Sequence, residues 1–187
     1  MANLKLNNVV ALSETGGVAT FGTPSATLKF PTGHVLQVVS YYTTTESSIT
    51  VSTSDQIING MTKVITPLGT ASDFLVSVRW MGESEDTWDK NYNIHMNSTR
   101  VNVSNTDAYH GLAVAANTYS NGINDSSTPD SLAFSTLVST SSVIGTDITF
   151  SLVTSGNATS VTWSNRCFAG SANEDFTSEL IITEIAG

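Results

Sequence analysis

The stretch LKFPTGHVLQVVSYYTTTESSITVSTSDQIINGMTKVITPLGTASDFLVSVRWM, residues 28–81, decides the fold class of this 187-residue chain. Short runs of apolar and β-branched residues alternate in it with connections rich in Ser, Thr, Gly, Pro and Asn. The runs are Val35–Val39, Ile49–Val51, Ile57–Ile65 and Phe74–Met81. None of them holds a helical period, so the stretch predicts a sheet with roughly one strand per ten residues.

Strand candidates of the same kind continue to the end of the chain. They are His34–Tyr42, Ser48–Ser54, Ile57–Ile65, Asp73–Met81, Tyr92–Val103, Gly111–Tyr119, Leu132–Ser139, Asp147–Thr154, Val161–Phe168 and Glu179–Ile185, and we expect Tyr92–Val103 to hold two strands. Alternate residues from Phe74 to Trp80 share one apolar face, which is typical of an antiparallel sheet with one side on a core. We therefore expect an all-β, antiparallel jelly-roll sandwich of about 8–10 strands over residues 31–187.

Residues 1–30 differ from the rest, because their apolar pieces are too short to form a core of their own. We expect an extended N-terminal arm, with a hairpin near Glu14–Gly17, that becomes ordered by docking on a neighbouring protein. A disordered terminus is the alternative. The residues expected to dock are Leu4, Leu6, Val9, Val10, Leu12, Val18 and Phe21.

The composition predicts a surface rich in hydroxyl groups and poor in charge. Charged residues make up 12% of the chain, against about a quarter in a typical domain, while Ser and Thr fill more than a quarter of the positions. Such a surface suits close packing in an assembly, because few charges lose their water on burial, and it also suits contact with sugars.

The net charge of −9 argues against polyanionic partners. The basic residues are scattered along the sequence without a cluster, so binding to nucleic acid or to an anionic membrane is disfavoured. Cys167 is the single cysteine, so no intrachain disulfide is expected. Neither an apolar signal sequence nor a span of about 20 apolar residues is present, and we expect a soluble protein.

The sequence shows no motif of a catalytic centre. His34, His95 and His110 lack metal-ligand spacing, and no nucleophile elbow, phosphate-binding glycine loop or zinc signature occurs. His95 alternates with apolar neighbours, which predicts an exposed histidine on a strand. We therefore expect a protein that is not an enzyme and that needs no cofactor.

One concentration of acidic residues surrounds Trp88 and follows the strand that ends at Met81. It consists of Glu83, Glu85, Asp86 and Asp89. A solvated loop is the favoured interpretation, and these four residues remain weak candidates for a cation site. Catalysis by paired carboxylates is the least favoured alternative, because residues bunched in one loop do not face each other across a cleft.

Four aromatic residues fall in or near the predicted loops. They are Trp88, Tyr92, Tyr109 and Tyr119. Exposed rings among Asn and Asp side chains can stack on sugars, so these residues are the candidates for ligand contact. The alternative for each of them is a buried anchor in the core or in an interface.

The order of several pieces resembles a known group of proteins. The run Gly33–Val39 leads into a Thr/Ser-rich segment, Thr43–Thr53, and then into the turn Ile65-Thr66-Pro67 and the strand Phe74–Val78. A short closing strand, Leu180–Ala186, completes the pattern. This order is similar to that of virion structural proteins of tailed phages, over the start and the end of residues 30–187.

The resemblance implies a jelly-roll domain, homotrimeric, on a phage particle that is assembled in the host cytoplasm. The expected function is that of a head decoration protein or a short fibre, whose partners are the major capsid protein or a tail protein. The arm, residues 1–30, would attach it. The alternative is a receptor- or carbohydrate-binding tail-fibre tip that contacts glycans of the host surface. The resemblance transfers no catalytic residue.

Overall fold

The computed structural model describes residues 2–6, 9–15, 18–21, 30–85, 90–103, 111–114, 116–117, 129–156, 159–166 and 175–187. The chain divides into two compact units, Met1–His34 and Val35–Gly187. The second unit begins at Val35. From the sequence we expected the sandwich to begin slightly earlier, at residue 31. No helix in the described part of the chain is long and apolar enough to cross a membrane.

The first unit is a three-stranded antiparallel sheet. Its strands are β1 (Ala2–Leu6), β2 (Val9–Thr15) and β3 (Val18–Phe21), paired in the order β1-β2-β3. Thr15 pairs with Val18, so the β2–β3 connection is the hairpin expected near Glu14–Gly17. Strand β1 adds to this hairpin, and the segment predicted as an extended arm therefore has strand pairing of its own.

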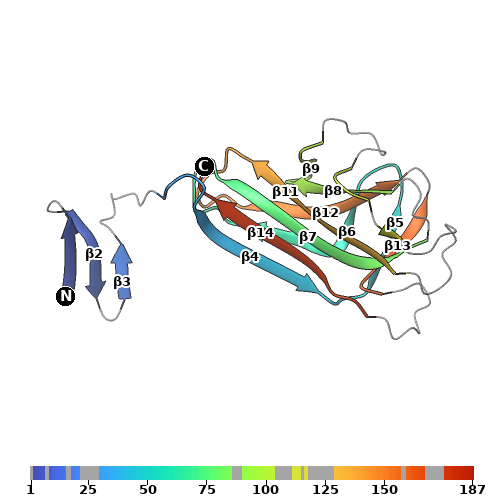
Figure 1. Ribbon diagram of the computed structural model, residues 1–187, viewed down its shortest axis with the longest axis horizontal. Coiled ribbons are helices and arrows are strands. Elements are labelled where there is room, and N and C mark those ends of the chain that lie inside the picture. Colours follow the sequence, from blue (N-terminus) through green and yellow to red (C-terminus); the bar gives the residue numbers. More distant parts are fainter. Residues whose placement is uncertain are drawn as a thin grey trace. The chain divides into compact units, whose positions relative to one another are not determined.

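The second unit contains the remaining strands, all of which pair in antiparallel fashion. They are β4 (Val35–Thr43), β5 (Ser47–Val51), β6 (Gln56–Ile65), β7 (Asp73–Ser84), β8 (Lys90–Met96), β9 (Thr99–Arg100), β10 (Ala116–Asn117), β11 (Asp130–Ser139), β12 (Ile148–Gly156), β13 (Ser160–Ser164) and β14 (Ser178–Ile185). The larger sheet has seven strands and the smaller one has four, in the order β6-β12-β8-β9. The two sheets pack as the layers of a sandwich (Figure 1).

The strand order is that of a jelly roll. In the larger sheet β4 pairs with β14, β14 with β7, and β7 with β11. If β4 with β5, and β13 with β14, are each counted as one interrupted strand and the two-residue β10 is set aside, the eight remaining strands alternate between the sheets along the chain. The exception is the hairpin that joins β8 to β9 within the smaller sheet. The first and last long strands are neighbours, as are β6 and β12 inside them. Eight strands in two such nested sheets define a jelly roll, and the predicted fold class is confirmed.

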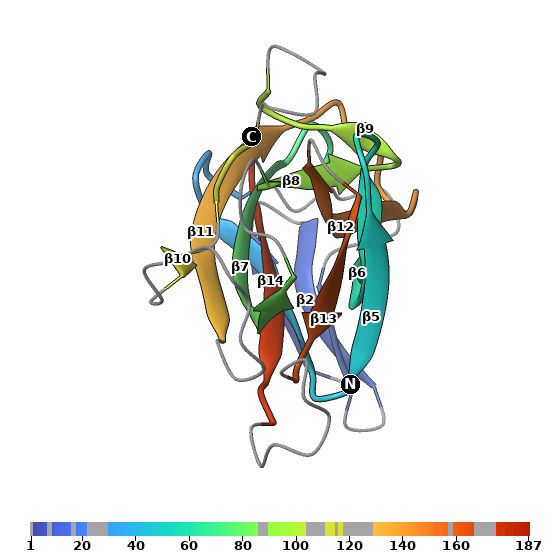
Figure 2. The ribbon, with the colours of Figure 1, turned by 90° about the vertical axis from the view of Figure 1, so that its right-hand side faces the viewer.

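Two strand lines run nearly the full length of the sandwich. Thr43 of β4 pairs with Ser178 of β14, and Ser47 of β5 pairs with Ser164 of β13, while β7 pairs with both β14 and β13. The strand β5 therefore continues the line of β4, and β14 continues that of β13. Figure 2 shows β5 beside β13 at the end of the sandwich that faces the viewer.

Asn165 directly follows β13, and its side chain bonds to the β4–β5 connection and to the first residue of β14. Its amide Nδ2 donates to the Thr45 carbonyl at 2.9 Å, and its Oδ1 accepts from the Ser178 hydroxyl at 2.7 Å. The residue has a φ of 61°, a left-handed conformation that Asn tolerates better than most residues. These bonds tie the chain to Thr45 and to the start of β14, between which it leaves the sheet after Ser164 and rejoins it at Ser178.

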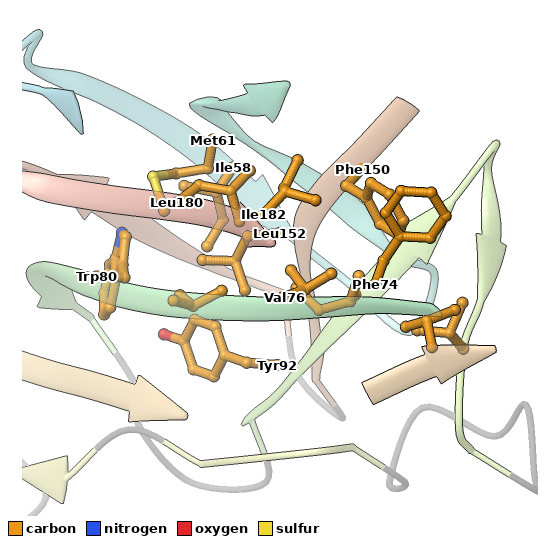
Figure 3. Packing of buried hydrophobic residues seen from close by; sticks show 14 of the residues in the cluster. Ile58, Met61, Phe74, Val76, Trp80, Tyr92, Phe150, Leu152, Leu180 and Ile182 are labelled. Atoms are coloured by element: carbon orange, nitrogen blue, oxygen red, sulfur yellow. The ribbon is translucent and has the colours of Figure 1, made fainter. Parts of the chain in front are cut away.

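The hydrophobic core lies between the inward faces of the two sheets, as the period of two predicted. It is composed of Ile58, Met61, Ile65, Phe74, Val76, Val78, Trp80, Tyr92, Ile94, Val101, Leu132, Val138, Ile148, Phe150, Leu152, Leu180 and Ile182. Two aromatic pairs bridge the sheets: Phe74 with Phe150, and Trp80 with Tyr92, with ring centroids 5.5 Å and 5.3 Å apart. Figure 3 shows these pairs at opposite ends of the labelled cluster.

A buried carboxylate ties the 66–72 loop to the end of the sheet. Glu184 of β14 accepts hydrogen bonds from the backbone N–H groups of Leu68 and Gly69, at 3.0 and 2.8 Å, and from the Ser72 hydroxyl at 2.7 Å. The Gln37 amide donates a further bond at 2.6 Å. Burial alone would raise the pKa of the Glu184 carboxyl, but these donors outweigh it and lower the pKa.

Candidate functional site

The acidic residues around Trp88 do not form the single solvated loop that we predicted. Glu83 lies within β7 and is completely buried, so for this residue the interpretation was wrong. Glu85 is exposed just beyond β7, where its carboxylate accepts from the Val161 N–H at 2.9 Å. Asp86 and Asp89 lie outside the described residues. Within the described part of the chain, no group of three His, Cys, Asp or Glu side chains could hold a metal ion.

Of the four aromatic candidates for ligand contact, the structure describes Tyr92 alone. Its side chain is fully buried against Trp80, so Tyr92 cannot stack on a ligand at the surface, and this prediction is corrected. The reason is its position in β8, where its ring points into the sandwich. Trp88, Tyr109 and Tyr119 lie outside the described residues.

Each of the predicted docking residues of the first unit lies in one of the strands β1, β2 and β3.

A charged cluster that the sequence did not predict lies on the smaller sheet. The His95 ring nitrogen Nε2 and the Asp55 carboxylate are hydrogen-bonded at 2.6 Å. The Arg100 guanidinium donates to the two oxygens of the same carboxylate, also at 2.6 Å, and to the Ser155 hydroxyl at 3.1 Å. The three charged side chains are only 8–15% exposed. We call this group the Asp55 cluster.

The β8–β9 hairpin positions two members of this cluster. Its turn is Asn97-Ser98, and both residues have positive φ angles, 48° and 68°, as a tight two-residue hairpin requires. This turn places His95 directly opposite Arg100 on the neighbouring strand. Asp55 lies in the connection between β5 and β6. The cluster therefore joins a loop to a hairpin from a different part of the sequence.

The charges of the Asp55 cluster compensate each other. Burial alone would raise the pKa of the Asp55 carboxyl, but the hydrogen bonds and positive charge of His95 and Arg100 hold it well below its usual range. Asp55 is therefore ionised at neutral pH. Because a bidentate guanidinium–carboxylate pair fixes both side chains, the cluster is rigid.

An open cavity of about 320 Å³ lies beside the Asp55 cluster. Its lining combines the charged residues with hydroxyl groups: Thr53, Ser54, Asp55, His95, Ser98, Thr99, Arg100 and Val103. A His–Asp pair can act as a general base, but in nucleophilic catalysis it needs a hydroxyl or thiol within hydrogen-bond reach. Among the described residues, Asp55 is the side chain bonded to the His95 ring, and no nucleophile is.

A second polar cluster is buried between the sheets at the end where β7 finishes. The Lys90 ammonium of β8 donates to the Thr162 hydroxyl of β13 at 3.0 Å, and this bond crosses from one sheet to the other. Thr162 and Ser84 share a hydrogen bond of 3.2 Å, and the Ser84 N–H donates to Asp130 at 2.9 Å. All four of these residues are at most 4% exposed. We call them the Lys90–Asp130 network.

Burial governs the electrostatics of this network. It raises the pKa of the Asp130 carboxyl to about 6, although the Ser84 N–H and the Lys90 charge act in the opposite direction. The Tyr92 hydroxyl also lies close to Asp130, and burial raises its pKa. Within the described part of the chain, Asp130 Oδ1, the Tyr92 hydroxyl and the Thr154 hydroxyl are buried without a hydrogen-bond partner. This end of the interior is therefore polar, in contrast to the apolar end at Phe74.

Sequence reasoning missed both clusters, but one signal was available. Tyr92–Val103 was expected to hold two strands, and a two-residue turn at Asn97-Ser98 puts His95 opposite Arg100. The partners Asp55 and Asp130 could not be found in this way, because they come from distant positions. No family model matches the sequence, and a search of the curated proteins finds no match.

Proposed function

We propose that the chain is a non-enzymatic structural protein on the surface of a tailed-phage particle, as a homotrimeric head decoration protein or short fibre. The observation that carries the proposal is the division of the chain into a small three-stranded unit and a jelly-roll sandwich. The order of the pieces from Gly33 to Val78, which resembles that of such virion proteins, supports it. In this proposal the first unit attaches to the particle and the sandwich is displayed.

The chemistry of the described surface is consistent with this role. The hydroxyl-rich composition has few charges to desolvate when subunits pack against one another. The strongest charged cluster, at Asp55, pairs its carboxylate with Arg100 and His95 and holds two parts of the sandwich together. These features favour a stable building block, whose partners would be the major capsid protein or a tail protein.

Deletion of residues 1–25 tests the attachment step. The deleted chain should keep the circular dichroism spectrum of a β-sandwich and its oligomeric mass, and it should no longer be incorporated into particles. The control is Ile57→Ser, which changes an exposed residue of β6 and leaves the first unit intact. Incorporation of the deleted chain at the level of the control would contradict the proposed role of the first unit.

A second candidate function is recognition of host-surface glycans by the displayed domain. The cavity beside the Asp55 cluster favours it, because hydroxyl and carboxylate groups bind sugar hydroxyls well and the cavity is open to solvent. The variant Ser54→Ala/Thr99→Val should then lose binding on a glycan array, while Thr50→Val, an exposed threonine of β5, should retain it. If the wild-type chain binds nothing on a broad array, this candidate is rejected.

A further inference from the structure

The larger sheet has an outer face that no described element of the second unit covers, formed by residues of β4, β14, β7 and β11 that point away from the core. The strand registers arrange these residues in rows across the sheet. The rows are Val38-Thr183-Leu75-Leu137, Ser40-Ile181-Ser77-Ser135 and Tyr42-Glu179-Arg79-Ala133. We call this surface the outer face.

The first of these rows is accessible and, apart from Thr183, apolar. Val38, Leu75 and Leu137 are 59%, 36% and 51% exposed, and Tyr42 on the third row is 71% exposed. An antiparallel sheet with one side in water usually carries polar residues on that side. Contiguous exposed apolar residues on a flat sheet mark a contact surface for another protein.

The outer face carries little charge, although the chain as a whole has a net charge of −9. In its three rows the ionisable side chains are Tyr42, Arg79 and Glu179, and the last two form an ion pair at 3.9 Å. The further outward row, Val35-Ile185-Asp73-Ser139, adds the carboxylate of Asp73. Two copies of an acidic chain repel each other least where faces with so little net charge meet.

The second row makes the outer face complementary to itself. Ser40, Ser77 and Ser135 carry hydroxyl groups, and Ser77 and Ser135 share a hydrogen bond of 2.8 Å. A hydroxyl group is both a donor and an acceptor, so a row of hydroxyls can bond to an identical row. Carboxylates and ammonium groups lack this property.

The area of the outer face is sufficient for an interface. With strands about 4.8 Å apart and about 3.4 Å per residue, four strands of nine residues cover roughly 19 Å by 30 Å. Two such faces together bury on the order of 1,000 Å², which is the lower limit for specific association. A weaker or smaller patch would not support a stable oligomer.

We propose that the outer face of β4, β14, β7 and β11 is the surface through which one copy of this chain binds a second copy. This inference goes beyond the homotrimer of the proposed function, because a face that meets its equal relates two copies by a twofold axis, whereas the contacts within a trimer are head-to-tail. Its test uses the purified full chain, so its outcome does not depend on whether the protein belongs to a virion.

The test compares molar mass by light scattering and sedimentation. Leu75→Glu/Leu137→Glu should have half the mass of the wild-type assembly, because each interface then contains four new carboxylates. Ile57→Glu/Val64→Glu is the matched control, since these residues of β6 are similarly exposed, 52% and 45%, on the other sheet. The control should keep the wild-type mass.

A second variant distinguishes loss of the contact from misfolding of the chain. Ser77→Arg/Ser135→Arg alters only polar outer-face residues, and it should also halve the mass while keeping the wild-type thermal unfolding transition. A single-chain mass for the wild type over a wide range of concentrations would overturn the inference. So would a wild-type mass in both outer-face variants, because the contact would then lie elsewhere.

Discussion

The Arg100 guanidinium donates from Nε to Oδ2 and from Nη2 to Oδ1 of the Asp55 carboxylate, at 2.6 Å in each case. Because the two residues are 45 positions apart, this pair connects the β5–β6 loop to the β8–β9 hairpin. Both side chains are largely removed from solvent, with 12% and 8% exposure. The bonds therefore contribute to stability in a way that an exposed ion pair does not.

Asp55→Asn should lower the free energy of unfolding by about 3 kcal/mol, because it leaves the buried Arg100 charge without its counter-ion. Urea denaturation at pH 7 measures the change. Glu46→Gln is the control, since this carboxylate is 50% exposed and pairs with Arg166 at 3.4 Å, and its loss should cost at most about 1 kcal/mol. Equal losses in the two variants would show that the Asp55 cluster is not a special source of stability.

The contribution of Asp55 should also depend on pH. Its pKa is lowered on folding from an ordinary value of 3.8, so the folded state favours the ionised form. The stabilisation is complete above that value and is lost as the pH falls below it toward the pKa of the folded state. The difference in unfolding free energy between the wild type and Asp55→Asn should thus shrink as the pH falls from about 4 toward 2. A difference that grows on acidification would contradict this assignment.

Asp130 should have the opposite pH dependence. Its pKa rises from 3.8 to about 6 on folding, so the folded state holds its proton more tightly than the unfolded state does. Stability should fall as the pH rises from about 4 to above 6, by about 3 kcal/mol at 1.4 kcal/mol per pKa unit. Asp130→Asn can still accept from the Ser84 N–H and does not ionise. It should therefore be more stable than the wild type at pH 8, and the gain should disappear near pH 4.

Guanidinium chloride denaturation at several pH values measures this gain. The titrations of Asp55 and Glu184 are common to both proteins and cancel in the difference. Less stability for Asp130→Asn than for the wild type at pH 8 would mean that the ionised carboxylate is satisfied by the Lys90 charge.

Glu184→Gln should destabilise the sandwich by about 2 kcal/mol, in the range measured for hydrogen bonds to charged groups. The amide group of Gln would face N–H donors, because Leu68 and Gly69 both donate to the native carboxylate. The matched control is Glu179→Gln on the same strand, where the carboxylate is 33% exposed and its contact with Arg79 is long, 3.9 Å. A thermal shift in Glu184→Gln no larger than that of the control would sink the idea.

The strands could be predicted from the sequence because each is decided by neighbouring residues. The run Asp73–Met81 was expected and is the body of β7, and its inward residues, Phe74 to Trp80, are those that the period of two indicated. The pattern failed where polar residues enter the interior. From the sequence, Glu83 was expected to lie in a solvated loop that follows Met81. Instead β7 continues through Glu83 and Ser84, because β11 and β13 pair with its end.

The candidate site could not be predicted for a related reason. Lys90 and Asp130 are polar residues at the ends of strands, and by local pattern such residues belong to the surface. They are buried because the sheets bring them close to Thr162 and Ser84, from two further strands. Tyr92 was misjudged for the same cause, since its loop-like neighbours Asn91 and Asn93 are themselves buried. Pairing over long sequence distances decides all of these positions.

Gly82→Ala should prevent the assembly of β7 with β13. A Cβ atom at position 82 would overlap the backbone carbonyl oxygen of Trp163 and would lie 2.6 Å from the Trp80 ring. Gly82 pairs with Ser164 at the centre of the larger sheet, so the backbone cannot move away without breaking that pairing. We expect a loss of at least about 3 kcal/mol, as for other severe overpacking, or insoluble protein.

Gly145→Ala provides the comparison for this variant. Its Cβ would meet no atom within 4 Å, and the cost comes only from a left-handed φ of 77°, about 1 kcal/mol. Thermal unfolding of the two variants, expressed in parallel, separates steric overlap within the sheet from backbone strain in a loop. If Gly82→Ala is as soluble and as stable as Gly145→Ala, β7 and β13 cannot approach as closely as the register of Gly82 with Ser164 requires, and the continuous line from β13 to β14 would have to be revised.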